Sequence, residues 1–378
     1  MKKLLLSLGI LFFASQLISQ ALIINHNHTK INLIPQSAIE AAKSDLHIAY
    51  GHTSHGSQLT EGMDGLVGFM NANGYPHNLY AWSNGGANGS LDLHDYAMAG
   101  DVGYYPEWMN NTRAYLGLPN QFTGRGTGAN ADVNVIIWSW CGQVEEKYAS
   151  GALITEYFNP MQQLETDYFG IKFVYMTGHL DHWDDAMNKA ANQAVRDFCS
   201  ANNKILYDFA DIESYNPDMT HFPYSNDDCS YYDASGNYLG NWALEWQNTH
   251  QEGVDWFDCG AAHSWPLNAN QKAYAAWWLW ARLAGWDQSF TSIQKPENQD
   301  KWRFFPNPTT NHITIEWQNP VNHVVAEIFD TFGTCVLSEH FDESSKHILR
   351  FDQIKNGLYY LKVGDGQSFW SEKLVVQQ

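Results

Sequence analysis

A polar turn flanked by glycines, Gly51-His52-Thr53-Ser54-His55-Gly56-Ser57, follows the apolar run 46–50. The apolar run is typical of a short buried strand, and residues 58–71 predict a helix. A serine on such a strand-to-helix turn lies at the carboxyl edge of a sheet, where ligands bind in open α/β folds. Its hydroxyl could act as a nucleophile, and the N–H groups that begin the helix could stabilise an oxyanion. The alternative is a serine-rich turn that only caps the helix.

A histidine that could act as the base for Ser54 lies near the end of the same region. His263 belongs to the loop 258–268, directly before a predicted final helix from Asn268 to about Leu283, with Asn268 as its N-cap. A histidine at this place can reach back to the edge of the first strand and accept the proton of a serine hydroxyl. The alternative is a structural histidine bonded to a backbone carbonyl.

The elements that must position these two residues alternate between strand and helix from about residue 45 to 287. The apolar runs predict five strands, and a further helix is expected over 184–201. The predicted strands are 45–51, 79–82 (the weakest), 133–140, 171–177 and 204–209. This alternation favours an α/β fold with a mainly parallel sheet. Two long stretches, 83–128 and 214–259, fit neither template, and we expect them to be loops that form the walls of a cleft.

The third predicted strand ends in Ser139-Trp140-Cys141-Gly142-Gln143. The amide of Gln143 could donate to an oxyanion, and Gly142 would allow the backbone to approach the substrate closely. Cys141 is a rival nucleophile that His263 or His179 could activate, although a buried, inert cysteine is the plainer interpretation. The glycine cluster that includes Gly86 could supply another oxyanion N–H group.

Further histidines and acids follow the first and fourth predicted strands. His52 and His55 flank Ser54, and His179, Asp181 and His182 follow strand 171–177. His and Asp suit several divalent ions, but this spacing matches no strong metal motif. We therefore predict substrate-binding or supporting roles for His52, His55, His179 and Asp181, with no metal and no cofactor.

The placement of Ser54 after the first strand and of His263 before the last helix resembles the SGNH/GDSL hydrolase superfamily, over residues 45–287. The resemblance implies a flavodoxin-like three-layer α/β/α domain, here with long loop insertions, and serine ester hydrolysis. That superfamily usually places its acid three residues before the histidine, where this chain has Gly260. We predict Asp258 as the substitute acid, with Asp255, Asp208 and Asp211 as alternatives. A Ser-His dyad without an acid also remains open.

The chain divides into four predicted segments. Residues 1–21 resemble a secretory signal peptide, 22–288 form the α/β domain, 289–302 form a linker, and 303–378 show short alternating strands typical of a small immunoglobulin-like β-sandwich. The last segment resembles the type IX secretion C-terminal sorting domain, through Phe305-Pro306-Asn307-Pro308, the stretch 328–333 and the stretch 356–363. The resemblance implies that the type IX machinery is a partner and that the protein is secreted or attached to the cell surface. A carbohydrate-binding β-sandwich is the alternative.

Composition excludes some partners. The formal net charge is −20, and such a surface is a poor partner for nucleic acid, because phosphate binding needs clusters of Lys and Arg. No run beyond the signal peptide approaches a membrane span, so we predict no transmembrane segment. The five cysteines include Cys229 and Cys259, which bracket a loop-rich segment and form our preferred disulfide.

These observations favour a secreted serine hydrolase acting on an ester, with an acyl group on a polysaccharide or related glycan as the leading candidate. Two other classes stay open. One is a polysaccharide lyase or glycosidase on the same scaffold, with histidines, Tyr104 or Tyr105, and Glu145 or Glu146 as candidate acid–base groups. The other is a non-catalytic glycan-binding protein. A small ester is the minimal substrate of the leading hypothesis.

Overall fold

The computed structural model describes residues 21–287, 302–321, 324–330, 335–341, 344–351, 354–364 and 369–377. The chain divides into two units, Met1–Gln288 and Ser289–Gln378. The predicted signal peptide and linker lie almost entirely outside the described residues.

The first unit is built on one parallel sheet. Its strands are β1 (Leu22–Ile24), β2 (His47–Gly51), β3 (Trp82–Ser83), β4 (Leu91–His94), β5 (Val135–Trp138), β6 (Lys172–Met176) and β7 (Ile205–Tyr207). They lie side by side in the order β1-β7-β6-β5-β2-β4-β3, and every neighbouring pair is parallel. Without the two edge strands, the order is 2-1-3-4-5 in chain order, which is the flavodoxin-like arrangement. The predicted fold class is confirmed.

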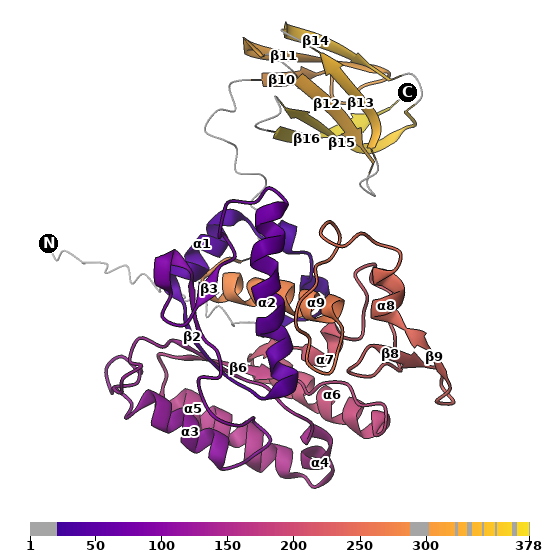
Figure 1. Cartoon of the computed structure of the whole chain (residues 1–378). Helices are drawn as coiled ribbons and strands as arrows, with labels where there is room; N and C mark the ends of the chain where they lie inside the picture. Colours follow the sequence, from indigo (N-terminus) through magenta and orange to yellow (C-terminus); the bar gives the residue numbers. More distant parts are fainter. Residues whose placement is uncertain are drawn as a thin grey trace, which may run out of the picture. The chain divides into compact units, whose positions relative to one another are not determined.

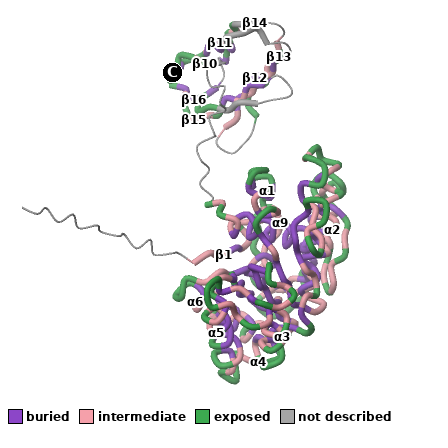
Figure 2. The backbone as a smooth tube through the Cα atoms, turned by 90° about the vertical axis from the view of Figure 1, so that its left-hand side faces the viewer, coloured by how far each residue is buried: buried purple, intermediate pink, exposed green. Residues whose placement is uncertain are grey.

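Helices cover both faces of this sheet (Figure 1). One layer contains α1 (Gln36–Asp45), α2 (Ser54–Ala72) and α9 (Pro266–Leu283). The other contains α3 (Glu107–Leu116), α4 (Val144–Ala149), α5 (Asn159–Asp167) and α6 (Asp185–Ala201). Figure 2 shows the buried residues concentrated in the interior between these layers. None of the described helices is long and apolar enough to cross a membrane.

Local sequence patterns explain the main elements. All four residues of β5 are buried, as expected for a central parallel strand that helices cover on both faces. In α6 the buried residues recur every three or four positions, which turns one stripe of the helix toward the sheet. Pro266 begins α9 at a position where its missing N–H costs nothing, so Trp265 rather than Asn268 is the N-cap.

Two strands of the parallel sheet, β4 and β1, were not predicted. The second strand of the central five is β4, within the stretch we expected to be a loop, whereas the predicted strand 79–82 contributes only to the two-residue edge strand β3. β1 was not predicted and pairs with β7. Both missed strands are only three or four residues long, too short for a periodic pattern to distinguish them from a loop.

The predicted disulfide is wrong, because all five cysteines are free in the structure. Cys229 lies against the Ser264 hydroxyl, with 3.3 Å between Sγ and Oγ. Cys259 instead accepts a hydrogen bond from the Asn270 amide. The segment between the two cysteines is ordered by other means, including strands β8 (Ser230–Tyr232) and β9 (Tyr238–Asn241) and helix α8 (Trp242–Gln247).

The second unit has two antiparallel sheets, as predicted. One contains β10 (Trp302–Phe305), β11 (His312–Val321) and β14 (Ser344–Arg350). The other contains β12 (Val324–Phe329), β13 (Cys335–Phe341), β15 (Gly357–Gly364) and β16 (Phe369–Val376). Alternate residues of β12 are buried in a core shared with strands of both sheets, which is the arrangement of a β-sandwich.

Candidate active site

Ser54 is the first residue of α2 and lies three residues after the carboxyl end of β2. The tight turn depends on glycine at two positions. A Cβ atom at Gly51 would lie 2.4 Å from the Trp138 ring, and one at Gly56 would lie 2.3 Å from the Ser139 hydroxyl. The absence of side chains therefore allows the first turn of α2 to pack against the end of β5, and this holds Ser54 at the edge of the sheet.

His263 lies against Ser54, with its Nε2 2.9 Å from the serine Oγ. The two residues are 209 positions apart in the chain and meet because α9 packs beside α2. His263 is exposed and its backbone is left-handed, with φ = 64°. A non-glycine residue in this conformation persists only where its surroundings hold it.

The structure does not bring any of the four candidate acids to His263. Asp258 is exposed and forms no hydrogen bond or ion pair within the described part of the chain. Asp255 accepts the N–H of Gln251, 2.9 Å away. Asp208 is buried in a bidentate pair with Arg196, and Asp211 is bonded to His26. Each alternative carboxylate is thus bonded elsewhere, and none of the four predicted acids is hydrogen-bonded to His263 in the described part of the chain.

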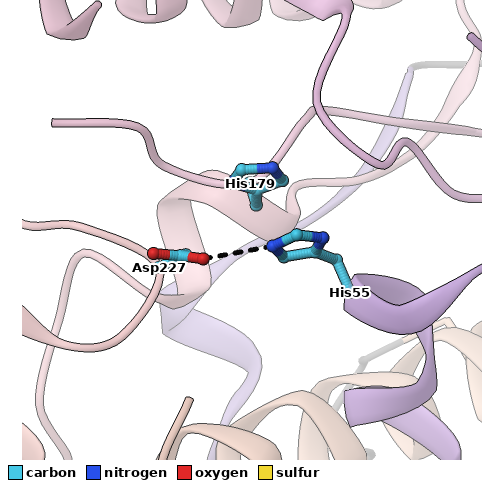
Figure 3. Close-up of side chains that lie close together, drawn as sticks. All are labelled: His55, His179 and Asp227. Carbon is cyan, nitrogen blue, oxygen red and sulfur yellow. Dashed lines mark hydrogen bonds and ion pairs between the residues drawn. The ribbon is translucent and has the colours of Figure 1, made fainter. Parts of the chain in front are cut away.

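A second nucleophile–base–acid series lies beside Ser54. Cys141 Sγ is 3.8 Å from Ser54 Oγ and 3.4 Å from His55 Nδ1. The other ring nitrogen of His55, Nε2, is 3.1 Å from the carboxylate of Asp227 (Figure 3). Because an ionised carboxylate only accepts hydrogen bonds, Nε2 carries the proton and Nδ1 is free to accept the thiol proton. Asp227 was not predicted; it lies 172 residues from His55, within the long insertion 214–259.

Three imidazole rings form a stack at this site. His55 stacks on His179 at a centroid distance of 3.8 Å and on His263 at 4.3 Å, with interplanar angles of 6° and 14°. Ligand atoms of His55, His179 and Asp227 lie within 4.8 Å of one another, so they are the residues that could approach a metal ion. A metal bonds in the plane of an imidazole ring, however, and the planes of two stacked rings do not meet at one ion. The arrangement therefore favours proton chemistry over metal binding.

Burial and neighbouring groups shift the pKa values of His55 and Asp227. Burial lowers the pKa of His55, the nearby His179 and His263 lower it further, and the hydrogen bond to Asp227 only partly offsets them. Burial alone would raise the pKa of Asp227, but the hydrogen bond from His55 and the proximity of His179 outweigh it and lower that pKa. His55 is therefore kept neutral, and Asp227 ionised, near neutral pH.

We expect the His55 ring to titrate with a midpoint below the ordinary value of about 6.5. Since Asp227 raises this pKa, Asp227→Asn should move the midpoint lower still. As the pH falls, His55 binds its proton at about pH 6.5 in the unfolded chain but only at a lower pH in the folded chain. Protonation of His55 therefore lowers the free energy of unfolding below about pH 6.5. Ring proton resonances followed by NMR would measure the midpoint, and a value above 6.5 would contradict the proposed environment.

His52, Gln143 and Gly142 lie next to the site. His52 is buried; its Nδ1 donates to the Thr53 carbonyl at 2.9 Å and its Nε2 lies 2.7 Å from Asp95. With both nitrogens engaged, His52 supports the turn and has none left for substrate.

Gln143 hydrogen-bonds Asp101, which also accepts the Thr53 hydroxyl at 3.3 Å. Gly142, with φ = 76°, has open space in front of its missing side chain.

Gly86 and Asp181 are not at the reacting groups. Gly86 uses its N–H in a turn to Ser83 and packs against Asp92, which bonds His47 at the opposite, amino end of β2. Gly86 therefore does not supply an oxyanion N–H group to Ser54. Asp181 accepts the N–H of Trp183 within its own turn, at 2.8 Å.

Comparison with known proteins identifies the second unit. Residues 303–377 match the family described as the secretion system C-terminal sorting domain, so the predicted type IX sorting domain is confirmed. The protein is accordingly secreted or attached to the cell surface, with the secretion machinery as its partner.

Similarity to whole proteins is slight. An endo-acting ulvan lyase from Formosa agariphila is 30% identical over 76 residues, which are 20% of this chain and 14% of that protein. This chain thus spans about a seventh of the length of that curated relative. A protein from Bacteroides fragilis, provisionally described as an acylhydrolase, is 9% identical over 53% of this chain and 81% of its own, with a TM-score of 0.26. An immunoglobulin-like β-sandwich from Bacteroides vulgatus is 12% identical over 21% of this chain and 88% of its own, with a TM-score of 0.20. With such TM-scores, neither structural likeness bears on what the first unit does.

Proposed function

We propose that the protein is a secreted ester hydrolase in which Ser54 is the nucleophile and His263 the general base. The observation that carries this proposal is the 2.9 Å contact between His263 Nε2 and Ser54 Oγ at the start of α2. A nucleophile and base within hydrogen-bond reach are the minimum that acyl transfer requires.

In this mechanism His263 accepts the Ser54 proton while Oγ attacks the ester carbonyl. Negative charge develops on the carbonyl oxygen, next to the start of α2. The first N–H groups of a helix have no partner within it and point toward that end, where the helix dipole also favours negative charge. The first N–H that bonds within α2 is that of Ser57, to the Thr53 carbonyl at 3.3 Å. His263 then returns the proton to the leaving alcohol, and water completes the second half of the reaction.

We further propose an acyl group on a polysaccharide or related glycan as the substrate. Exposed aromatic rings occur on three of the segments that form the site: Tyr96 is 57% exposed, Trp183 89% and Trp265 38%. Tyr96 packs on His52, and Trp265 lies two residues after His263. Flat aromatic faces next to a hydrolytic centre suit the apolar faces of sugar rings, and export places the enzyme where extracellular glycans occur.

Labelling with a fluorophosphonate probe, followed by peptide mapping, tests the proposal. We expect the phosphonyl group on Ser54 in the full chain and a loss of labelling in both Ser54→Ala and His263→Ala, because the probe reacts with a serine that a base has activated. Thr60→Ala, on the same helix, is the matched hydroxyl control and should keep normal labelling. Efficient labelling of another residue, or of the Ser54→Ala variant, would contradict the proposal.

A second candidate is thiol-based acyl chemistry at Cys141, which the Asp227–His55–Cys141 series favours. That series has the acid that the Ser54–His263 pair lacks. Turnover measurements on single variants separate the two candidates. If Cys141 is the nucleophile, turnover should survive Ser54→Ala and be lost in Cys141→Ala and after alkylation with iodoacetamide.

A further inference from the structure

The residue before His263 is bonded to α2 through its backbone. The peptide groups of Ala262 are bonded on both sides by side chains of α2. Its carbonyl accepts the Gln58 amide at 2.6 Å, and its N–H donates to Glu61 Oε2 at 3.0 Å. Gln58 and Glu61 follow Ser54 by four and seven residues, so all three lie along one face of α2. Helix α2 therefore carries the proposed nucleophile and is also hydrogen-bonded to the loop that carries the proposed base.

The Glu61 carboxylate lies next to Gly260, the position at which an SGNH-type chain would usually carry its acid. A Cβ atom at Gly260, three residues before His263, would lie 2.9 Å from the Glu61 carboxyl carbon. A longer side chain at position 260 and the Glu61 carboxylate would therefore compete for the same space. The carboxylate that this part of the loop lacks is supplied by the neighbouring helix.

A buried ion pair orients Gln58, the side chain that bonds the Ala262 carbonyl. Lys272, on α9, donates to Gln58 Oε1 and to Glu213 Oε2, the latter at 2.6 Å, and the side chains of Lys272 and Glu213 are both fully buried. The bond from Lys272 orients the Gln58 amide so that its NH₂ group faces Ala262. Close approach of the two helices makes this contact possible, because a Cβ atom at Gly62 would lie 2.1 Å from the Ala269 carbonyl oxygen.

We propose that Glu61 is the positioning carboxylate of this site, acting with Gln58 through the Ala262 peptide groups to hold His263 against Ser54. This inference rests on the proposed function, and it assigns the place of the missing acid to a helix two turns beyond the nucleophile. Glu61 acts through the backbone, since its carboxylate accepts the Ala262 N–H and forms no hydrogen bond with the His263 ring among the described residues.

Two substitutions at Glu61 separate positioning from charge. Glu61→Ala removes the acceptor for the Ala262 N–H, and we expect kcat on an activated ester to fall about 10²-fold with little change in KM, because a small misplacement of a catalytic group has an effect of this size. Glu61→Gln keeps a carbonyl oxygen at the same reach, so it should restore kcat to within about fivefold of the wild type, the difference between a charged and a neutral acceptor. Asp64→Asn, an exposed carboxylate one turn further along α2, is the matched control and should behave as wild type.

Hydrogen exchange of the loop 258–266 gives a readout that does not depend on turnover. In the full-length protein, Glu61→Ala should increase exchange at this loop, while Glu61→Gln and Asp64→Asn should leave it protected. Unchanged protection in Glu61→Ala would overturn the inference, as would faster exchange accompanied by normal kcat. If instead wild-type Ser54 is neither labelled nor needed for turnover, the proposed function fails, and the exchange result still reports whether Glu61 holds the loop.

Discussion

Replacing Ser54 by alanine is expected to lower kcat on an activated ester such as a p-nitrophenyl ester by about 10⁴–10⁶-fold. Loss of a serine nucleophile has an effect of this order, and the residual rate comes from oxyanion stabilisation and binding. Circular dichroism and thermal unfolding should stay close to those of the wild type, because the Ser54 side chain is only partly buried and its hydroxyl has just two hydrogen-bond partners, His263 and Cys141, within the described residues.

A double substitution shows whether Ser54 and His263 act as one unit. If they do, His263→Ala should cost about as much as Ser54→Ala, and the double variant should lose little more, since residues that act together are strongly non-additive. Independent, multiplicative losses would argue against the pair. Near-normal turnover in Ser54→Ala, together with an inactive Cys141→Ala, would transfer the nucleophile to Cys141.

Lys272→Met is expected to have the largest effect on stability, lowering the free energy of unfolding of the first unit by about 3–5 kcal/mol. The substitution leaves the carboxylate of Glu213 fully buried without its cation and removes a donor to Gln58. Burial raises the pKa of Glu213, and the charge of Lys272 opposes that rise. Without Lys272 the pKa of Glu213 in the folded protein rises further. The loss in free energy of unfolding relative to the wild type should therefore be small below the unfolded pKa of about 4.3 and grow as the pH rises.

Urea unfolding at pH 5 and pH 8 would measure this deficit. Lys204→Met is the matched control, because Lys204 forms a partly exposed pair with Glu165 and should cost at most about 1 kcal/mol. Adding Glu213→Gln to Lys272→Met removes the buried charge and should recover part of the loss. A deficit for Lys272→Met equal to that of the control, or one that does not depend on pH, would contradict the role assigned to the buried pair.

Elements that depend on local residue patterns could be predicted from the sequence. The apolar run before Gly51 and the apolar run around β5 predict central strands, and the three-to-four-residue periodicity predicts α6, because each pattern involves residues adjacent in the chain. The alternation of these elements predicted an α/β fold with a mainly parallel sheet, the resemblance to the SGNH/GDSL superfamily implied its flavodoxin-like order, and short motifs identified the sorting domain. The positions of Ser54 and His263 also followed from local context: each lies at the boundary of a predicted helix, at one edge of the sheet.

Which polar groups meet depends on how distant parts of the chain pack together. Asp227 reaches His55 from 172 residues away, and Glu61 reaches Ala262 from 201 residues away. Neither pairing has a signal in the residues around it, because a carboxylate on a loop or on a helix face has the same local appearance whether or not it finds a partner. Asp258, the acid closest to His263 in the chain among those proposed, lies exposed, and Gly86 lies at the opposite end of β2. Closeness in the sequence is therefore a poor guide to which side chains meet. Their distances depend on the packing of α2 against α9 and on the path of the insertion 214–259.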